Sequence, residues 1–266
     1  MGAEKFRCAL AAAFFCRFVV KSLFMNIFIT RHGQTDWNLA KKLQGRSDIP
    51  LNENGILQAK RTFLGLKKSG IAFDRVYSSP LQRAVKTAEI ISGFSGDKII
   101  KDKRIIEFSF GEAEGRTLGE IESLPELEWI KNFFDNPEKY KPKSGAETFS
   151  SVLTRTQDFW ESEIRNLSLR NPECENVLVV THGGTLQSLL LHVDGRKLSE
   201  YWNVEFPNCS MNLVKLNSAK LNLIELNPEK SEKIGSDKES SKSEKLHSEL
   251  LSRGVFSLEW TGRVFY

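Results

Sequence analysis

Two histidines in this sequence stand directly after short apolar runs, and each is followed by glycine. Arg31 and His32 follow "NIFIT" at residues 26–30, and His182 follows "NVLVVT" and precedes Gly183. An unprotonated imidazole can act as a nucleophile near neutral pH, and an arginine fork fits the geometry of an oxyanion. A basic pair after a strand is more commonly a solvated loop, so the elements around these residues must decide between solvation and catalysis.

Two more charged residues, Arg83 and Glu107, are expected to lie near the ends of strands. In "SSPLQRAVK", Ser79 is expected to cap a helix that starts at Pro80, with Gln82 completing a capping box, so that Arg83 lies in the first turn. Positive charge is unfavourable at a helix N-terminus, which favours an anion nearby. Glu107, in "IIEFSFGE", follows an apolar stretch and is expected to project from a strand end, with an exposed loop carboxylate as the alternative.

The periodicity predicts the elements that must position these residues. Uninterrupted runs rich in Val and Ile predict buried strands at residues 26–30, 74–79, 98–100 and 176–182. Helical spacing of apolar residues predicts one helix over 53–70, capped by Asn52, and another over 146–167. This alternation predicts an α/β fold, a three-layer sandwich with a mostly parallel central sheet.

Such a sheet would bring the strand-end residues together. The carboxyl ends of parallel strands lie at one edge, so Arg31, His32 and His182 should meet in one crevice. A helix that begins after His182 would aim free backbone N–H groups into the same crevice. Farther along, "MNLVKLN" and "LNLIELN", between residues 211 and 227, predict a closing hairpin or edge strands.

The two ends of the chain differ from the middle. Residues 1–24 hold an apolar run that Arg17 interrupts before it could span a bilayer. We interpret them as a dispensable extension, with a weak signal or membrane-surface anchor as the alternative, and predict no integral membrane segment. Residues 25–228 form the predicted catalytic domain. Residues 229–266 begin with a charged low-complexity linker and end in an apolar tail that either adds a strand or binds a partner.

Composition excludes several classes of function. The formal net charge is +4 in 266 residues, and the basic residues are scattered among acidic ones, so nucleic acid is not indicated as a partner. The four cysteines, Cys8, Cys16, Cys174 and Cys209, show no CxxC spacing and no nearby histidine pair. Neither a zinc site nor a disulfide framework is therefore predicted, and a reducing, cytoplasmic setting is expected.

Five segments in order carry a resemblance to a known family. They are "TRHGQTDWN", "LQGRSDIPLNENGILQA", "VYSSPLQRAVKTAEI", "IIEFSFGEAEG" and "VLVVTHGGT". With these segments the chain resembles the histidine phosphatase superfamily, with its phosphoglycerate mutase-like fold, from about residue 25 to about residue 227. The second segment is most similar to the small phosphatase branch, which includes alpha-ribazole phosphatase.

The resemblance implies a role for each candidate residue. His32 would be the nucleophile that forms a phosphohistidine, and Glu107 the acid and base. The phosphate- and substrate-binding residues would be Arg31, Asn38, Gln44, Gly45, Arg83, His182 and Gly183. Arginines and backbone N–H groups would stabilise the phosphoryl charge, so neither a metal nor another cofactor is expected.

Three functions fit these residues. The leading prediction is a metal-independent phosphatase that acts on a small-molecule phosphomonoester. A cofactor-dependent phosphoglycerate mutase is the alternative, and a non-enzymatic module that binds a phosphorylated ligand is a lesser one. Mutases of the family carry extra basic residues after the acid glutamate, whereas residues 116–144 here hold isolated lysines and no Arg-Arg pair. This difference favours the phosphatase.

Overall fold

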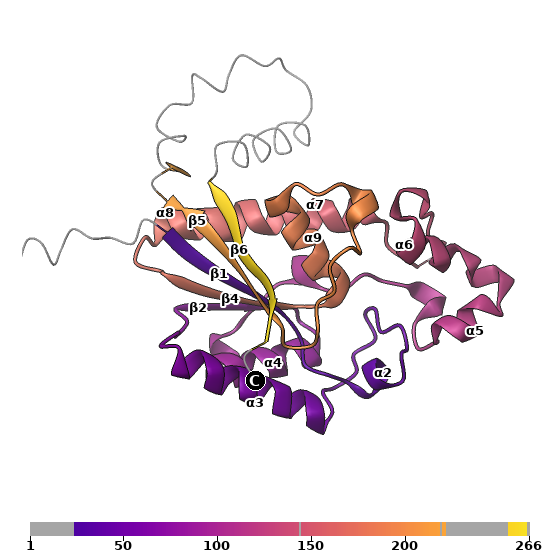
Figure 1. Cartoon of the computed structure of the whole chain (residues 1–266), viewed down its shortest axis with the longest axis horizontal. Helices are drawn as coiled ribbons and strands as arrows, with labels where there is room; N and C mark the ends of the chain where they lie inside the picture. The colour runs from indigo at the N-terminus through magenta and orange to yellow at the C-terminus, as the bar shows by residue number, and fades with distance from the viewer. Residues whose placement is uncertain (1–23, 144, 219, 222–254, 265–266) are drawn as a thin grey trace, which may run out of the picture.

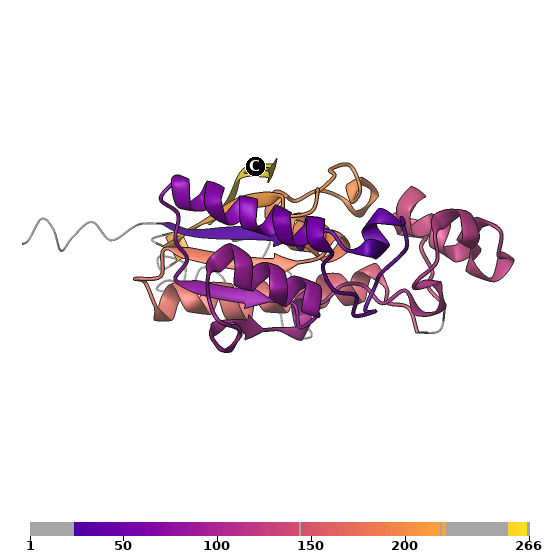
Figure 2. The same ribbon diagram turned by 90° about the horizontal axis from the view of Figure 1, so that it is seen from below.

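Three layers make up the protein, a central six-stranded sheet with helices on both faces (Figures 1 and 2). The computed structural model describes residues 24–143, 145–218, 220–221 and 255–264. The strands are β1 (Phe24–Arg31), β2 (Arg75–Ser78), β3 (Ile100–Lys101), β4 (Asn176–Thr181), β5 (Met211–Asn217) and β6 (Phe256–Arg263). The predicted α/β sandwich is thus confirmed.

The helices are divided between the two faces. They are α2 (Asp36–Leu39), α3 (Glu53–Lys68), α4 (Gln82–Ser92), α5 (Leu118–Glu122), α6 (Lys131–Asp135), α7 (Phe149–Phe159), α8 (Asn166–Arg170) and α9 (Gly183–Asp194). Helices α3 and α4 cover one face, and α7, α8 and α9 cover the other (Figure 1). None of the helices within the described residues is both long and apolar enough to cross a membrane.

The sheet is mixed. Its strand order is β3-β2-β4-β1-β5-β6, and the first four strands run parallel to one another. Strands β5 and β6 extend it with antiparallel pairs, β5 on β1 and β6 on β5. The parallel part carries the predicted strand ends, because Arg31 of β1 pairs with Thr181 of β4. His32 and His182 therefore leave the sheet side by side.

The predicted hairpin after residue 211 is wrong. The first run forms β5, but both of its edges are occupied, by β1 and by β6, which leaves no edge for an adjacent hairpin partner. Most of the second run, residues 222–227, lies outside the described residues. The predicted extension at residues 1–23 and the predicted linker up to residue 254 also lie outside them. Of the two possibilities for the apolar tail, the structure has the added strand, β6.

Two predicted helix starts have different outcomes. Asn52 caps α3 as predicted, and its side chain accepts the Gly55 N–H at 2.9 Å. The helix predicted from residue 146 starts at Phe149 behind Thr148, whose hydroxyl accepts the Ser151 N–H. It runs through α7 and a π-helical segment into α8.

A separate aromatic cluster covers the carboxyl edge of the sheet. Its rings are Phe108, Phe110, Phe133, Tyr140, Phe149 and Tyr201. They meet mostly edge to face, as Phe108 and Phe133 do with centroids 5.0 Å apart at 81°. This cluster anchors the segment that carries α5 and α6 above the strand ends, where the candidate residues gather.

We expect Phe256→Ala to lower the free energy of unfolding by about 3 kcal/mol, the usual cost of a large cavity at a buried ring. Phe256 is 5% exposed and meets Trp160 edge to face with centroids 5.4 Å apart. Urea unfolding followed by circular dichroism measures the change, with Ser257→Ala, at an exposed position of the same strand, as control. Equal urea midpoints for both variants would show that β6 adds nothing to the core.

Candidate active site

The two predicted histidines meet at the carboxyl edge of the sheet. Their ring centroids lie 5.1 Å apart, and the His32 N–H donates to the carbonyl of Thr181 at 2.9 Å. Both rings are buried, with 3% exposure for His32 and none for His182. The parallel register of β1 and β4 thus produces the pairing that the sequence predicts.

The hydrogen bonds of His32 define its tautomer. Its Nδ1 lies 2.7 Å from the carbonyl oxygen of Gly33, an acceptor, so Nδ1 carries the proton. Its Nε2 accepts the Arg83 Nε–H at 3.3 Å. Burial, followed by the positive charges of Arg83 and Arg31, holds the pKa of His32 well below its usual value. The ring is therefore neutral at pH 7 and has its lone pair on Nε2.

Arg83 is held by a loop and by both histidines. Its Nη1 and Nη2 donate to the carbonyls of Ser47 and Gly45, each at 2.7 Å, and its Nε also lies 3.2 Å from His182 Nδ1. Burial lowers the pKa of Arg83 to about 10, so the guanidinium stays charged at neutral pH. A fixed positive charge thus lies against the reactive nitrogen.

The predicted cap at Ser79 is wrong. Helix α4 begins at Gln82 with Leu81 as its N-cap, and the Gln82 N–H donates to Asp48 Oδ1 at 2.7 Å. The Ser79 hydroxyl lies 2.7 Å from His182 Nε2 and accepts the Leu81 N–H at 3.4 Å, so its short contact is to the histidine and it is not the N-cap. Arg83 nevertheless lies in the first turn, as predicted.

Glu114, which the sequence analysis did not identify, shapes the loop that holds Arg83. Its carboxylate accepts the N–H groups of Arg46 and Phe110 on Oε1 and that of Ser47 on Oε2, at 2.8 to 3.1 Å. Gly45 has a φ of +50°, and a Cβ there would lie 2.1 Å from Glu114 Oε1. No sequence pattern separates this glutamate from the other acidic loop residues, because its partners are backbone groups.

A second loop holds the Arg31–His32 pair. Arg31 Nη1 donates to the carbonyl of Phe206 at 2.9 Å, the Cys209 N–H donates to the carbonyl of Arg31, and Asn208 Nδ2 donates to the carbonyl of His32 at 2.8 Å. Arg31 Nε is buried and has no hydrogen-bond partner among the residues that the structure describes. An unpartnered buried donor is costly, so this N–H is a ready contact for an oxyanion.

Glu107 does not end a strand. It follows a short 3₁₀ turn, Lys103–Ile105, and its carboxylate lies at the N-terminus of α9. Oε2 accepts the Gly184 N–H at 3.1 Å, and Oε1 accepts the Thr185 N–H at 3.0 Å. Glu107 therefore occupies two of the N–H groups that we expected to be free for an oxyanion. The partial positive charge of the helix N-terminus favours a carboxylate at this position.

The candidate residues surround a cleft of about 250 Å³. Predicted residues in its lining are Arg31, His32, Asn38, Gln44, Gly45, Arg83, Glu107 and Gly183. The further walls, which the sequence analysis did not identify, include Lys42, Leu43, Phe110, Phe133, Phe134 and Trp202. His182 is absent from the lining because it lies fully buried behind Arg83 and contacts the cleft through that guanidinium.

Asn38 and Gln44 form one small network in this lining. The Asn38 side-chain oxygen accepts the Thr35 N–H at 3.1 Å and so helps to cap α2. The Thr35 hydroxyl lies 3.0 Å from Gln44 Oε1. These bonds fix both side-chain amides beside the cleft.

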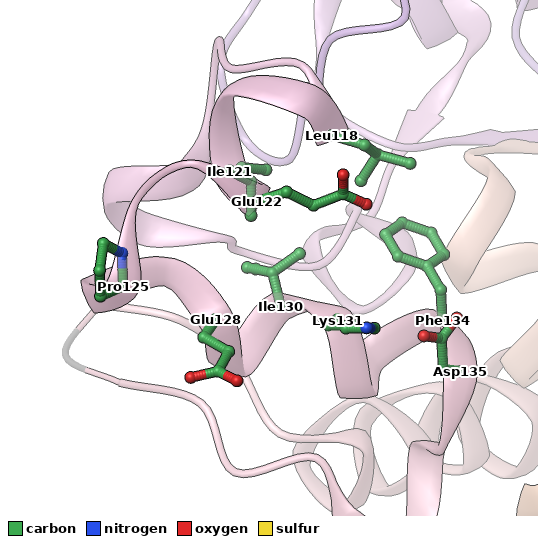
Figure 3. Close-up of a pocket in the computed structure, with 9 residues that line it drawn as sticks. All are labelled: Leu118, Ile121, Glu122, Pro125, Glu128, Ile130, Lys131, Phe134 and Asp135. Atoms are coloured by element: carbon green, nitrogen blue, oxygen red, sulfur yellow. The ribbon is translucent and has the colours of Figure 1, made fainter.

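A second pocket, of about 490 Å³, lies between α5, the turn Pro125–Ile130 and α6 (Figure 3). Its lining is Leu118, Ile121, Glu122, Pro125, Glu128, Ile130, Lys131, Phe134 and Asp135. Phe134 lines both this pocket and the catalytic cleft. The second pocket has no histidine, cysteine or serine in its lining, so it offers no nucleophile comparable to His32.

We expect the free energy of unfolding to fall as the pH drops below about 6.5, the ordinary pKa of histidine. Burial, with the charge of Arg83 next, holds the pKa values of His32 and His182 well below that value in the folded protein. The unfolded chain then binds protons that the folded chain does not bind. This difference lowers the free energy of unfolding by up to about 1.4 kcal/mol per pH unit for each ring.

Urea unfolding at pH 7.5, 6.5 and 5.5 measures this dependence. The His32→Ala variant should lose about half of it, because one of the two buried rings is gone. A wild-type stability that stays flat over this range would contradict the buried, neutral state of both histidines.

Comparisons with known proteins agree with this arrangement. The profile of the histidine phosphatase superfamily (branch 1) matches residues 27–228. The "Putative phosphoserine phosphatase 2" of Hydrogenobacter thermophilus is 31% identical over 193 residues, 71% of this chain and 89% of the relative. The "Probable phosphoglycerate mutase GpmB" of Serratia proteamaculans is 32% identical over 190 residues, 71% of this chain and 84% of the relative.

A solved structure shares the fold. The phosphoserine phosphatase of Entamoeba histolytica, a mutant in complex with phosphoserine, matches with a TM-score of 0.59 and 27% identity, over 71% of this chain and 90% of that one. Together with the matched profile, this likeness shows that the chain belongs to the histidine phosphatase superfamily. It is an enzyme of that superfamily, and its relatives include phosphatases and mutases.

Proposed function

We propose that this enzyme hydrolyses a small phosphomonoester through a phosphohistidine on His32. The observation that carries the proposal is the His32 ring, which is neutral, fixed through Nδ1 to Gly33 and turned with Nε2 toward Arg83. In the first step Nε2 attacks phosphorus, the P–N bond forms and the ester P–O bond breaks. In the second step water attacks phosphorus, the P–N bond breaks and inorganic phosphate leaves.

Glu107 is the group that we assign to the proton transfers. It lines the cleft together with His32 and is 9% exposed, so its carboxyl is within the reaction space and shielded from bulk water. It would give a proton to the leaving alkoxide and take one from the attacking water, which returns it to its starting state. The N–H groups of Gly184 and Thr185 hold it in place between the two steps.

Protein groups supply the positive charge that phosphoryl transfer requires. Arg31 and Arg83 both line the cleft, and the buried Arg31 Nε–H has no partner within the described residues. Fixed cationic donors stabilise the charge on the transferring oxygens without a metal ion. His182 would act through Arg83, whose Nε it contacts, and Asn38, Gln44, Gly45 and Gly183 would complete the phosphate-binding wall.

A mutase is the second candidate, because several relatives carry that name. The mostly aromatic walls of the cleft favour the phosphatase, since Phe110, Phe133, Phe134 and Trp202 offer no charge to the second acidic group of a phosphoglycerate, and Lys42 is the single lysine in this lining. The test is release of inorganic phosphate from a panel of phosphomonoesters, with excess chelator, and with and without a bisphosphoglycerate primer. Hydrolysis that is independent of primer and chelator supports the proposal, whereas isomerisation that requires the primer identifies a mutase.

We also propose a cytoplasmic setting and a catalytic domain that spans residues 25–228, to whose sheet the C-terminal tail adds β6. The buried free thiols of Cys174 and Cys209 fit a reducing compartment.

A further inference from the structure

A third hollow, of about 490 Å³, adjoins the catalytic cleft, and we call it the side arm. The two share Arg31, Phe134, Gly183 and Trp202 as lining residues. The remaining walls of the side arm are Gln187, Val204, Glu205, Phe206 and Pro207. A phosphoryl group held by Arg31 therefore has direct access to this space, so the alcohol part of a substrate can extend into it.

Two aromatic rings form the boundary between the cleft and the side arm. The ring centroids of Phe134 and Trp202 lie 5.5 Å apart at 39°, and each ring packs against Phe133. Trp202 Nε1 donates to the carbonyl of Phe133 at 2.6 Å, so its single polar atom is used within the protein. These two half-buried side chains thus offer π-surface rather than hydrogen bonds.

Apart from Arg31, the charged residue in the lining of the side arm is an acid, Glu205. Glu205 is exposed and forms no ion pair with any described residue. The Gln187 amide is used within the protein, since Nε2 donates to the carbonyl of Val204 and Oε1 accepts from Arg196. The catalytic cleft holds another cation, Lys42, but this residue does not line the side arm.

Resting on the proposed function, we propose that the side arm selects phosphomonoesters whose alcohol part carries an ammonium group. Aromatic faces attract a cation through their quadrupole, and the Glu205 carboxylate adds a direct charge pair. With a phosphoryl group on Arg31, the remaining side chains of the side arm favour a cation and disfavour a carboxylate. Glu205 is then a specificity-determining residue and takes no part in the chemistry at phosphorus.

Three esters of similar size test this selection: phosphoethanolamine, which is cationic at its far end, n-propyl phosphate, which is neutral there, and phosphoglycolate, which is anionic. The wild-type enzyme should prefer phosphoethanolamine to n-propyl phosphate by about tenfold in kcat/KM, the size of a partly exposed charge and cation–π contact. Glu205→Gln should reduce this preference about fivefold and leave n-propyl phosphate unchanged. Glu205→Lys should shift it toward phosphoglycolate.

Glu138→Gln is the matched control, because Glu138 is exposed and outside the lining of the cleft and of the side arm. It changes the net charge equally and should leave the preference intact. This inference alone is overturned if the enzyme hydrolyses n-propyl phosphate but shows no preference among the three esters. It is also overturned if Glu205→Gln keeps the wild-type preference. An enzyme that hydrolyses none of the three, nor an aryl phosphate, overturns the proposed function and this inference with it.

Discussion

Replacement of His32 by alanine is expected to lower kcat at least about a thousandfold on every phosphomonoester, because no nitrogen remains to accept the phosphoryl group. The other groups that surround the reaction stay in place. Arg83 keeps its bonds to the carbonyls of Gly45 and Ser47, and Asn208 donates to a backbone carbonyl that alanine retains. The loss should therefore appear in turnover and not in the fold.

Steady-state hydrolysis of p-nitrophenyl phosphate, together with circular dichroism and thermal unfolding, measures this effect. His192→Gln is the matched control, since His192 lies in the last turn of α9 and is absent from the cleft lining. It should retain near wild-type turnover. A folded His32→Ala enzyme that keeps a tenth of the wild-type rate would show that another residue attacks phosphorus.

The second large effect is expected for Glu107→Gln, which should lower kcat on alkyl phosphates by about a hundredfold to ten-thousandfold. The amide has nearly the same shape but cannot donate an acidic proton to the leaving alkoxide. A p-nitrophenolate ion leaves without protonation, so the loss on p-nitrophenyl phosphate should be much smaller. This difference between substrates separates proton transfer from a change of position.

The measurement is kcat for n-propyl phosphate and p-nitrophenyl phosphate in the variant and the wild type. Glu112→Gln, at an exposed position of the loop that follows, serves as control and should change neither rate. The amide also turns an NH₂ toward the N–H of Gly184 or Thr185, so thermal unfolding should accompany the kinetics. Equal losses on both substrates would assign Glu107 a positioning role instead.

Local sequence patterns determine much of the fold. The apolar runs that form β1 and β4 each end next to a histidine, and parallel pairing alone brings His32 and His182 together. The Asn52 cap was predictable because its side chain bonds the backbone three residues away. These features depend on residues near in sequence or on the common direction of neighbouring strands.

Contacts between distant segments were not predictable. Glu107 takes its position from N–H groups of α9, and the short contact of Ser79 is to His182, which is distant in the sequence. Glu114 acts on backbone groups of another loop, which leaves no pattern in the sequence. The strand β6 pairs with β5 although residues 218–255 separate them in the sequence, so neighbouring runs wrongly suggested a hairpin.

Trapping the intermediate tests the central claim most directly. The enzyme is mixed with a phosphomonoester, quenched in alkali within one turnover, digested and analysed by mass spectrometry, because a phosphoramidate survives alkali and is lost in acid. We predict a single phosphoryl group on the peptide that contains His32, attached at Nε2, since Nδ1 is bound to the carbonyl of Gly33. A phosphoryl group on any other residue, or turnover that inverts the configuration at a chiral phosphorus and so indicates direct attack by water, would contradict the account.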